Sequence, residues 1–219
     1  MPSRQVHHGD AVAWLGEQAT LAGCSVVTSL PDATEGRWPT HADWETWFVD
    51  AAALVIDRVP DAGVAIFYQT DVKRDGAWVD KAALLARAAE RSGALAVFHK
   101  IVLRGAPRAT LRGLAGYSHL VAYSRGARAG VLTGSPDVLA AAGETTWTRG
   151  MGVLACRAAC EAVLALTPTR TVVDPFCGHG TVLAVANEMG LDAVGVEIAG
   201  RRVRRARALT LETLTGRAP

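Results

Sequence analysis

The residues best suited to chemistry form a glycine-rich segment late in the chain. The run VVDPFCGHGT at 172–181 predicts an apolar strand that reaches Asp174 and then enters a tight turn. Gly178 and Gly180 permit such a turn and let the backbone approach a ligand closely. A second apolar strand ends at Glu197, about 20 positions after Gly178. A carboxylate at this spacing can accept hydrogen bonds from both hydroxyls of a ribose.

This pattern favours a cofactor that contains adenosine but no pyrophosphate. No Gly-Lys-Ser or Gly-Lys-Thr follows the turn, so it is not a P-loop, and the third glycine of dinucleotide-binding turns is missing. S-adenosyl-L-methionine fits this description better than NAD or FAD. The alternative is an ordinary tight turn without a ligand.

The same residues resemble a known family. DPFCGHGT resembles the DPF-x-G-[ST]-G-T loop of amino-methyltransferases that act on DNA and RNA, and GVEIAGRRVRRAR resembles the segment that follows it. In permuted members of that superfamily the catalytic strand comes first in the chain and the cofactor loop comes last. HGDA at 8–11 resembles the Gly-Asp that begins the permuted proteins. VVTSLPD at 26–32 falls where they carry a strand ending in [DNS]-P-P-[YFW].

The resemblance implies roles for the matched residues. Asp10 is expected near the adenine, and Arg149 is expected to suit the methionine carboxylate because it precedes a helix; a helix cap with a surface arginine is the alternative for Arg149. The residues expected to bind S-adenosyl-L-methionine are Asp174, Phe176, Gly178, Gly180, Thr181, Glu197, Asp10 and Arg149. Those expected to be catalytic are Ser29, Pro31 and Asp32.

The catalytic loop keeps only half of the family pattern. Ser29 fits the serine version and Pro31 matches the second proline, but Leu30 replaces the first proline and Asp32 stands where an aromatic residue is expected. In the family that aromatic residue stacks on a flipped base. Asp32 could instead be a base or accept a hydrogen bond from an amine. The loop could also be a plain turn with a capping residue. A replacement for the stacking ring could come from Trp38, Trp44 or Trp47.

The elements that must position these residues alternate short apolar runs with amphipathic ones, which indicates an α/β fold with a parallel sheet. We expect seven strands, at 4–8, 25–30, 63–70, 95–103, 118–125, 171–176 and 192–198. We expect helices at 11–22, 42–59, 78–92, 150–166, 180–190 and 200–214, with a short one possible in the pattern at 137–142.

The expected architecture is a Rossmann-like class I methyltransferase fold in circularly permuted order. Its seven-stranded, mostly parallel sheet carries one antiparallel edge strand. Residues 104–116 leave no room for a helix, so the strands on either side are expected to be antiparallel neighbours at a sheet edge. One domain is expected, with a catalytic half at 1–125, a connector at 126–148 and a cofactor-loop half at 149–219.

Composition narrows the class of protein. The 219 residues are 50% hydrophobic and carry a net charge of +2, which neither demands nor excludes nucleic acid as a partner. The four cysteines form no CxxC pair and no zinc pattern, so we expect buried thiols and no metal. Neither a signal peptide nor an apolar stretch of about 18 residues is present. We therefore expect a cytoplasmic protein without a membrane span.

Two arginine clusters could bind the phosphates of a nucleic acid. Such clusters are more often solvent-exposed protein surface without a ligand. One places five arginines within residues 201–207. The other comprises Arg104, Arg108 and Arg112, with Arg125 and Arg128 just beyond.

Three functions follow from these expectations. The first is an S-adenosyl-L-methionine-dependent methyltransferase acting on an RNA nitrogen, because DNA methylases normally need a separate recognition domain and no segment here is long enough to form one. The second is the same enzyme with a small-molecule acceptor, held between the tryptophans. The third is a catalytically silent module that binds a partner. The sequence does not decide the oligomeric state.

Overall fold

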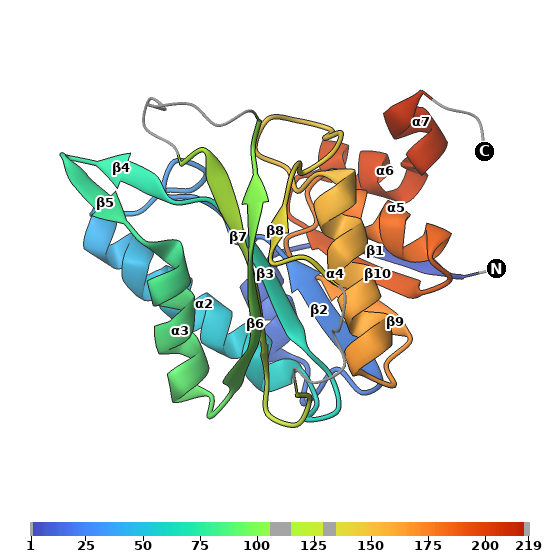
Figure 1. The fold of residues 1–219 in the computed structure, drawn as a ribbon, viewed down its shortest axis with the longest axis horizontal. Helices are drawn as coiled ribbons and strands as arrows, with labels where there is room; N and C mark the ends of the chain where they lie inside the picture. Colours follow the sequence, from blue (N-terminus) through green and yellow to red (C-terminus); the bar gives the residue numbers. More distant parts are fainter. Residues whose placement is uncertain (1, 106–114, 129–134, 217–219) are drawn as a thin grey trace.

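An eight-stranded mixed sheet forms the centre of the molecule, with helices on both faces (Figure 1). A computed structural model describes residues 2–105, 115–128 and 135–216. Its strands are β1 (Arg4–His8), β2 (Cys24–Thr28), β3 (Ala65–Gln69), β4 (Val72–Arg74), β5 (Ala77–Val79), β6 (Leu95–Leu103), β7 (Tyr117–Ser124), β8 (Val138–Leu139), β9 (Thr171–Asp174) and β10 (Asp192–Glu197). The order across the large sheet is β1-β10-β9-β2-β3-β7-β6-β8.

All seven expected strands are present, and five of them, β1, β10, β9, β2 and β3, run parallel. The prediction of one reversed strand is right, but its place at the edge is wrong. The reversed strand is β7, which lies inside the sheet between β3 and β6 and is antiparallel to both. Its side chains are buried from Ser118 to Ser124, as expected for a strand covered on both faces.

The eighth strand corrects the expectation of a seven-stranded sheet. β8 pairs in parallel with β6 at Ile101 and Val102, within the region 137–142 for which the sequence pattern suggests a short helix. The ammonium of the buried Lys100 in β6 donates to the carbonyl oxygen of Pro136, two residues before β8, at 2.8 Å. A second, unpredicted feature is the antiparallel hairpin of β4 and β5, which projects from the end of β3 (Figure 1).

Some of the described helices begin at a side-chain cap and others begin without one. They are α1 (Ala11–Gly16), α2 (His41–Arg58), α3 (Lys81–Arg91), α4 (Val153–Leu166), α5 (Thr181–Glu188), α6 (Gly200–Ala208) and α7 (Leu211–Thr215). Thr40 and Asp43 form a capping box that begins α2, and Asp80 caps α3 through a 2.9 Å hydrogen bond from the Ala83 amide. The helix expected at 180–190 is present as α5, which ends at Glu188 and is followed by Gly190 with a positive φ of 80°.

The sheet separates two apolar cores because neighbouring strand residues point to opposite faces. On β9, Val172 packs with α4 and α5, while Val173 packs with the α2 side. On β3, Ile66 and Phe67 divide in the same way. This packing fixes the carboxyl ends of β1, β2, β9 and β10 at one edge, where ligands bind in open α/β sheets. Among the described residues, none of the helices has the length and apolarity that a membrane crossing requires.

Candidate functional site

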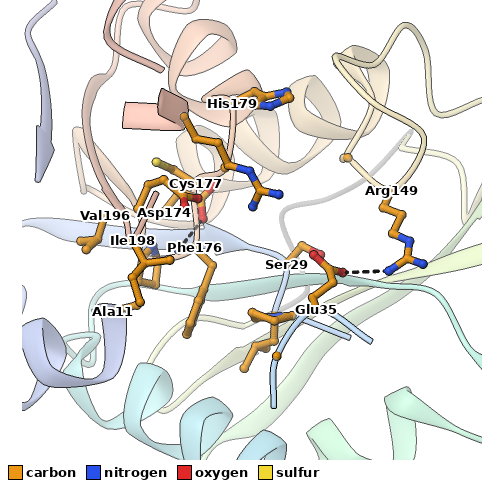
Figure 2. Close-up of a pocket in the computed structure, with 18 of the residues that line it drawn as sticks. Ala11, Ser29, Glu35, Arg149, Asp174, Phe176, Cys177, His179, Val196 and Ile198 are labelled. Atoms are coloured by element: carbon orange, nitrogen blue, oxygen red, sulfur yellow. Dashed lines mark hydrogen bonds and ion pairs between the residues drawn. The ribbon is translucent and has the colours of Figure 1, made fainter. Parts of the chain in front are cut away.

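A cavity of about 360 Å³ lies at the carboxyl ends of β1, β2, β9 and β10 (Figure 2). We call it the first cavity. It is lined by nine of the residues that the sequence singled out: Asp10, Ser29, Pro31, Arg149, Asp174, Phe176, Gly178, Thr181 and Glu197. Gly180 and Asp32 do not line it. Segments that are more than 160 positions apart in the chain therefore meet at one site.

Glu197 ends β10 as a buried carboxylate on the wall of the first cavity. Its Oε1 atom accepts a hydrogen bond of 2.7 Å from the Ala199 amide, which fixes the side chain. The next residue, Ile198, leaves 68% of its surface exposed although it is large and apolar. A fixed carboxylate beside an uncovered apolar side chain matches the two halves of an adenosine, the ribose hydroxyls and the flat base.

Asp174 ends β9 and is buried at the floor of the first cavity. Burial raises the pKa of Asp174 to about 7, and the charge of Glu197 adds to the rise. Hydrogen bonds from the Thr28 hydroxyl (2.7 Å) and the Phe176 amide (3.2 Å) act in the opposite direction. The site therefore holds a carboxyl group that is partly protonated near neutral pH.

Replacing Asp174 with asparagine is expected to flatten the pH dependence of stability between about pH 4 and pH 7. In the wild type the native carboxyl keeps its proton in this window and the unfolded one loses it. The free energy of unfolding therefore falls as pH rises, by on the order of a few kcal/mol. Asparagine cannot ionise, yet its oxygen can still accept from Thr28 and Phe176. Urea unfolding at several pH values measures the difference, and equal slopes in both proteins would contradict it.

The glycines of the turn have different neighbours. A side-chain carbon at Gly178 would meet nothing within 4 Å, so that backbone faces open space. At Gly180 the same carbon would lie 2.8 Å from the Cα atom of Ala206 in α6. Gly180 therefore allows the turn to pack against a helix, whereas Gly178 is the one that leaves room for a ligand. Gly195 on β10 is also required, because a side-chain carbon there would lie 2.8 Å from the sulfur of Cys177.

An aromatic group closes one side of the first cavity. The rings of Trp38 and Trp47 lie 5.2 Å apart, and Trp47 meets Phe176 edge-on at 6.2 Å. Trp44 is fully buried in the core and is stacked on His41 at 5.0 Å, so it does not offer the stacking surface that the sequence allowed for it.

The loop after β2 is fixed by hydrogen bonds from buried side chains to its backbone. The Trp44 indole donates to the carbonyl oxygen of Pro31 at 3.2 Å, and the buried Gln69 amide donates to that of Leu30 at 3.4 Å. Ser29 lines the first cavity and also a second cavity of about 380 Å³. Leu30, Glu35 and Arg149 likewise line both cavities. The loop is therefore part of the wall between two adjoining spaces.

Arg149 lies in this shared wall and is not at a helix start, because α4 begins only at Val153. Its guanidinium donates to the Thr34 hydroxyl at 2.7 Å and pairs with Glu35 at 3.8 Å. Figure 2 shows the two side chains pointing toward each other across the loop. The predicted contact between Arg149 and a methionine carboxylate stays a prediction.

Asp32 points into the second cavity, away from the first. Its Oδ2 atom lies 2.9 Å from the ammonium of Lys81, the first residue of α3. The side chain of Lys81 is 3% exposed and that of Asp32 is 18% exposed. Sequence reasoning missed Lys81, and nothing in its local sequence marks it as a site residue.

The sequence singled out Arg202 as part of a basic cluster, but it did not predict that Arg202, Trp147 and His179 form a rim of the first cavity. The Arg202 guanidinium lies over the Trp147 ring at 5.3 Å, and the ring of His179 lies 6.1 Å from that of Trp147. Burial, together with the charges of three α6 arginines, lowers the pKa of His179. The sequence allowed the arginines of α6 to bind phosphates. One of them, Arg207, instead donates a hydrogen bond to the carbonyl oxygen of Val6.

The second arginine cluster is only partly described. Arg108 and Arg112 lie outside the described residues. Arg104 lines the second cavity and donates to the Thr70 hydroxyl at 3.0 Å. Arg125 and Arg128 bind backbone carbonyl oxygens, which gives them a structural role.

Comparison with known proteins agrees with this geometry. A family model described as DNA methylase matches residues 163–208, which hold the glycine turn, Glu197 and α6. No curated protein matches the chain. Three similar solved structures are PvuII DNA methyltransferase (cytosine-N4-specific), the putative DNA modification methylase TTHA0409 of Thermus thermophilus complexed with S-adenosyl-L-methionine, and M1.HpyAVI complexed with SAM.

The three structures share the fold of this chain at low sequence identity. PvuII methyltransferase has a TM-score of 0.75 and 14% identity, over 99% of this chain and 91% of its own. TTHA0409 has a TM-score of 0.70 and 18% identity, over 93% of this chain and 92% of its own. M1.HpyAVI has a TM-score of 0.62 and 14% identity, over 93% of this chain and 97% of its own. The chain therefore has the fold of these methyltransferase structures and matches the DNA methylase family over its cofactor-loop segment.

Proposed function

We propose that the chain is an S-adenosyl-L-methionine-dependent methyltransferase that modifies an amino nitrogen of a base in nucleic acid, with DNA as the preferred acceptor. The observation that carries the proposal is the meeting of Glu197, Gly178 and the Ser29 loop around one cavity. The DNA methylase match covers the first two of these residues. It is also the reason to place DNA before RNA.

The first cavity fits the cofactor. Glu197 would hold the ribose hydroxyls, and Ile198 with the aromatic side would enclose the adenine. Asp10 already caps α1 through Oδ1, at 2.8 Å from the Ala13 amide, and its other oxygen can accept from the adenine amine. The open backbone at Gly178 leaves room for the methionyl part.

The chemistry needs placement more than a strong base. When bound, S-adenosyl-L-methionine supplies a methyl group on a sulfonium, and its sulfur keeps the electron pair of the broken bond. Ser29 stands in the wall between the cavities, where an amine in the second cavity would face the first. Its hydroxyl can accept a hydrogen bond from the amine and so orient the nitrogen lone pair. The proton that the amine then loses passes to water.

The permuted chain order is part of this proposal. The Ser29 loop follows β2 and the glycine turn follows β9, about 145 residues later in the chain. The two strands are nevertheless hydrogen-bonded neighbours. A catalytic loop near the start of the chain and a cofactor loop near its end would therefore lie next to each other in the fold.

A transfer assay with labelled methyl groups tests the proposal. The purified protein should label duplex or single-stranded DNA, and total RNA and nucleosides serve as parallel acceptors. Labelling should fall steeply as salt rises, since phosphate contacts release counterions. A salt-insensitive reaction with a nucleoside would favour the small-molecule acceptor. Cofactor binding without transfer to any acceptor would favour the silent module.

A further inference from the structure

The second cavity is the space next to the Ser29 loop that the cofactor does not need. It lies among the ends of β2 and β3, the β4 strand and the first residue of α3. Since Ser29, Leu30, Glu35 and Arg149 line both cavities, an acceptor in the second cavity would reach the methyl donor across this wall. This inference rests on the proposed function and adds how the acceptor base is recognised.

The charged side chains around the second cavity indicate the charge of the ligand that it would bind. Five cationic residues line it, against the two carboxylates of Asp32 and Glu35: Lys73, Arg74, Lys81, Arg104 and Arg149. Such an excess of positive charge favours an anionic ligand and suits the phosphates that flank a nucleotide. Lys73 and Arg74 stand on the hairpin strand β4, at the outer side, where a backbone phosphate would pass.

Within this cavity Asp32 and Lys81 present an acceptor and a donor side by side. Their ion pair uses one carboxylate oxygen and one ammonium proton. Among the described residues, the Oδ1 atom of Asp32 has no hydrogen-bonding partner, and an ammonium carries three protons. The pair can therefore engage a ligand without breaking.

Lys81 is held firmly enough to act in recognition. Its backbone amide donates to Oδ1 of the buried Asp71 at 2.9 Å. Asp71 is in turn bound by His119 at 2.8 Å and by the Trp78 indole at 3.2 Å. Burial alone would raise the pKa of Asp71, but the hydrogen bonds from His119, Lys81 and Trp78 outweigh it and hold the pKa below its ordinary value. The start of α3 is thus anchored to a buried carboxylate.

We infer that Asp32 and Lys81 hold the acceptor base by its edge, in the place where related loops hold it by ring stacking. Asp32 accepts from an N–H of the base and Lys81 donates to the ring nitrogen or carbonyl oxygen beside it. Adenine and cytosine both carry an amino group next to a ring nitrogen, so both fit this pair. The ligand class is an amino-substituted heterocycle within an anionic strand.

The first test measures binding, so it does not depend on transfer. Single-stranded oligodeoxynucleotides carry one adenine or the same site as purine, which lacks the amino group, with cytosine and 2-pyrimidinone as a second pair. Fluorescence anisotropy should show that the wild type prefers the amino base by about tenfold, the effect of one or two hydrogen bonds. Asp32→Leu, which removes the acceptor oxygens at similar volume, and Lys81→Met should each lose this preference. A wild type without preference, or variants that keep it, would overturn the inference.

The second test measures methyl transfer and includes a variant that carries an aromatic side chain at position 32. Asp32→Leu and Lys81→Met should lower kcat/KM for the acceptor by about tenfold to 50-fold, mainly through KM, while cofactor affinity by calorimetry stays within about twofold. Asp32→Tyr supplies the aromatic residue of the family pattern and should also lose activity. An Asp32→Tyr variant as active as the wild type would mean that stacking holds the base, and would reject recognition by the edge.

Matched controls separate recognition from stability. Asp50→Leu and Arg91→Met break an exposed ion pair of 2.7 Å between α2 and α3, outside both cavities. They should change neither preference nor kcat/KM. The double variant Asp32→Leu/Lys81→Met leaves no unpaired buried charge and should lose the preference as well. If the wild type discriminates in binding but labels no acceptor, the inference stands and the proposed function fails.

Discussion

Replacing Glu197 with alanine is expected to weaken the binding of S-adenosyl-L-methionine by about 100-fold or more. A carboxylate that accepts from two ribose hydroxyls loses two charge-assisted hydrogen bonds, each worth about 1.5–3 kcal/mol. The side chain is buried and fixed by the Ala199 amide, so no neighbouring group can take its place without rearrangement. Isothermal titration calorimetry with the cofactor measures the change directly.

Glu188→Ala is the matched control for that experiment. Glu188 ends α5 and forms an exposed ion pair of 2.6 Å with Arg157, away from the first cavity. Its loss should leave cofactor affinity within about twofold of the wild type, as for most surface pairs. Equal affinity of Glu197→Ala and the wild type would remove the assignment of the first cavity to the cofactor.

Replacing Gly180 with alanine is expected to lower the free energy of unfolding by about 2–4 kcal/mol. The residue has a φ of 85°, in the left-handed region that side chains disfavour, and the added carbon would press on the backbone of Ala206. Either the turn or α6 must shift. For a chain of this size the melting temperature should fall by roughly 5–10 °C.

Gly190→Ala isolates the contribution of the contact with α6. Gly190 has nearly the same φ, 80°, but a side-chain carbon there would meet nothing within 4 Å. Its substitution should cost only the backbone strain, about 1–2 kcal/mol. If the two variants melted at the same temperature, packing of the turn against α6 would contribute nothing to stability.

The sequence predicted most of the fold because central strands such as β2, β3 and β9 are largely buried and α2 and α3 begin at capping residues. The seven expected strands all formed, and β1 and β6 kept their predicted bounds. The misses have local causes. Residues 72–79 alternate too briefly to mark the β4–β5 hairpin, and β8 is a strand of two residues that exists only through its pairing with β6. The position of β7 inside the sheet depends on contacts between distant segments.

The residues of the candidate site also differ in whether the sequence alone could identify them. Asp174, Gly178 and Glu197 could be found because one strand–turn–helix–strand unit carries them at a fixed spacing. Lys81 could not be found, because its partner Asp32 lies 49 positions away and only the tertiary fold joins them. The departure of Asp32 from the family pattern was visible in the sequence, but its ion pair with Lys81 was not.

The wall shared by the two cavities has a thermodynamic consequence. Any displacement of the Ser29 loop, or of the Glu35–Arg149 pair, by a ligand on one side changes the surface offered on the other. The affinities of the two ligands are then coupled, and the coupling is reciprocal. The factor by which the methyl donor changes acceptor binding equals the factor by which the acceptor changes donor binding. In the proposed enzyme, exchange of spent for fresh donor would therefore depend on whether a modified base still occupies the second cavity.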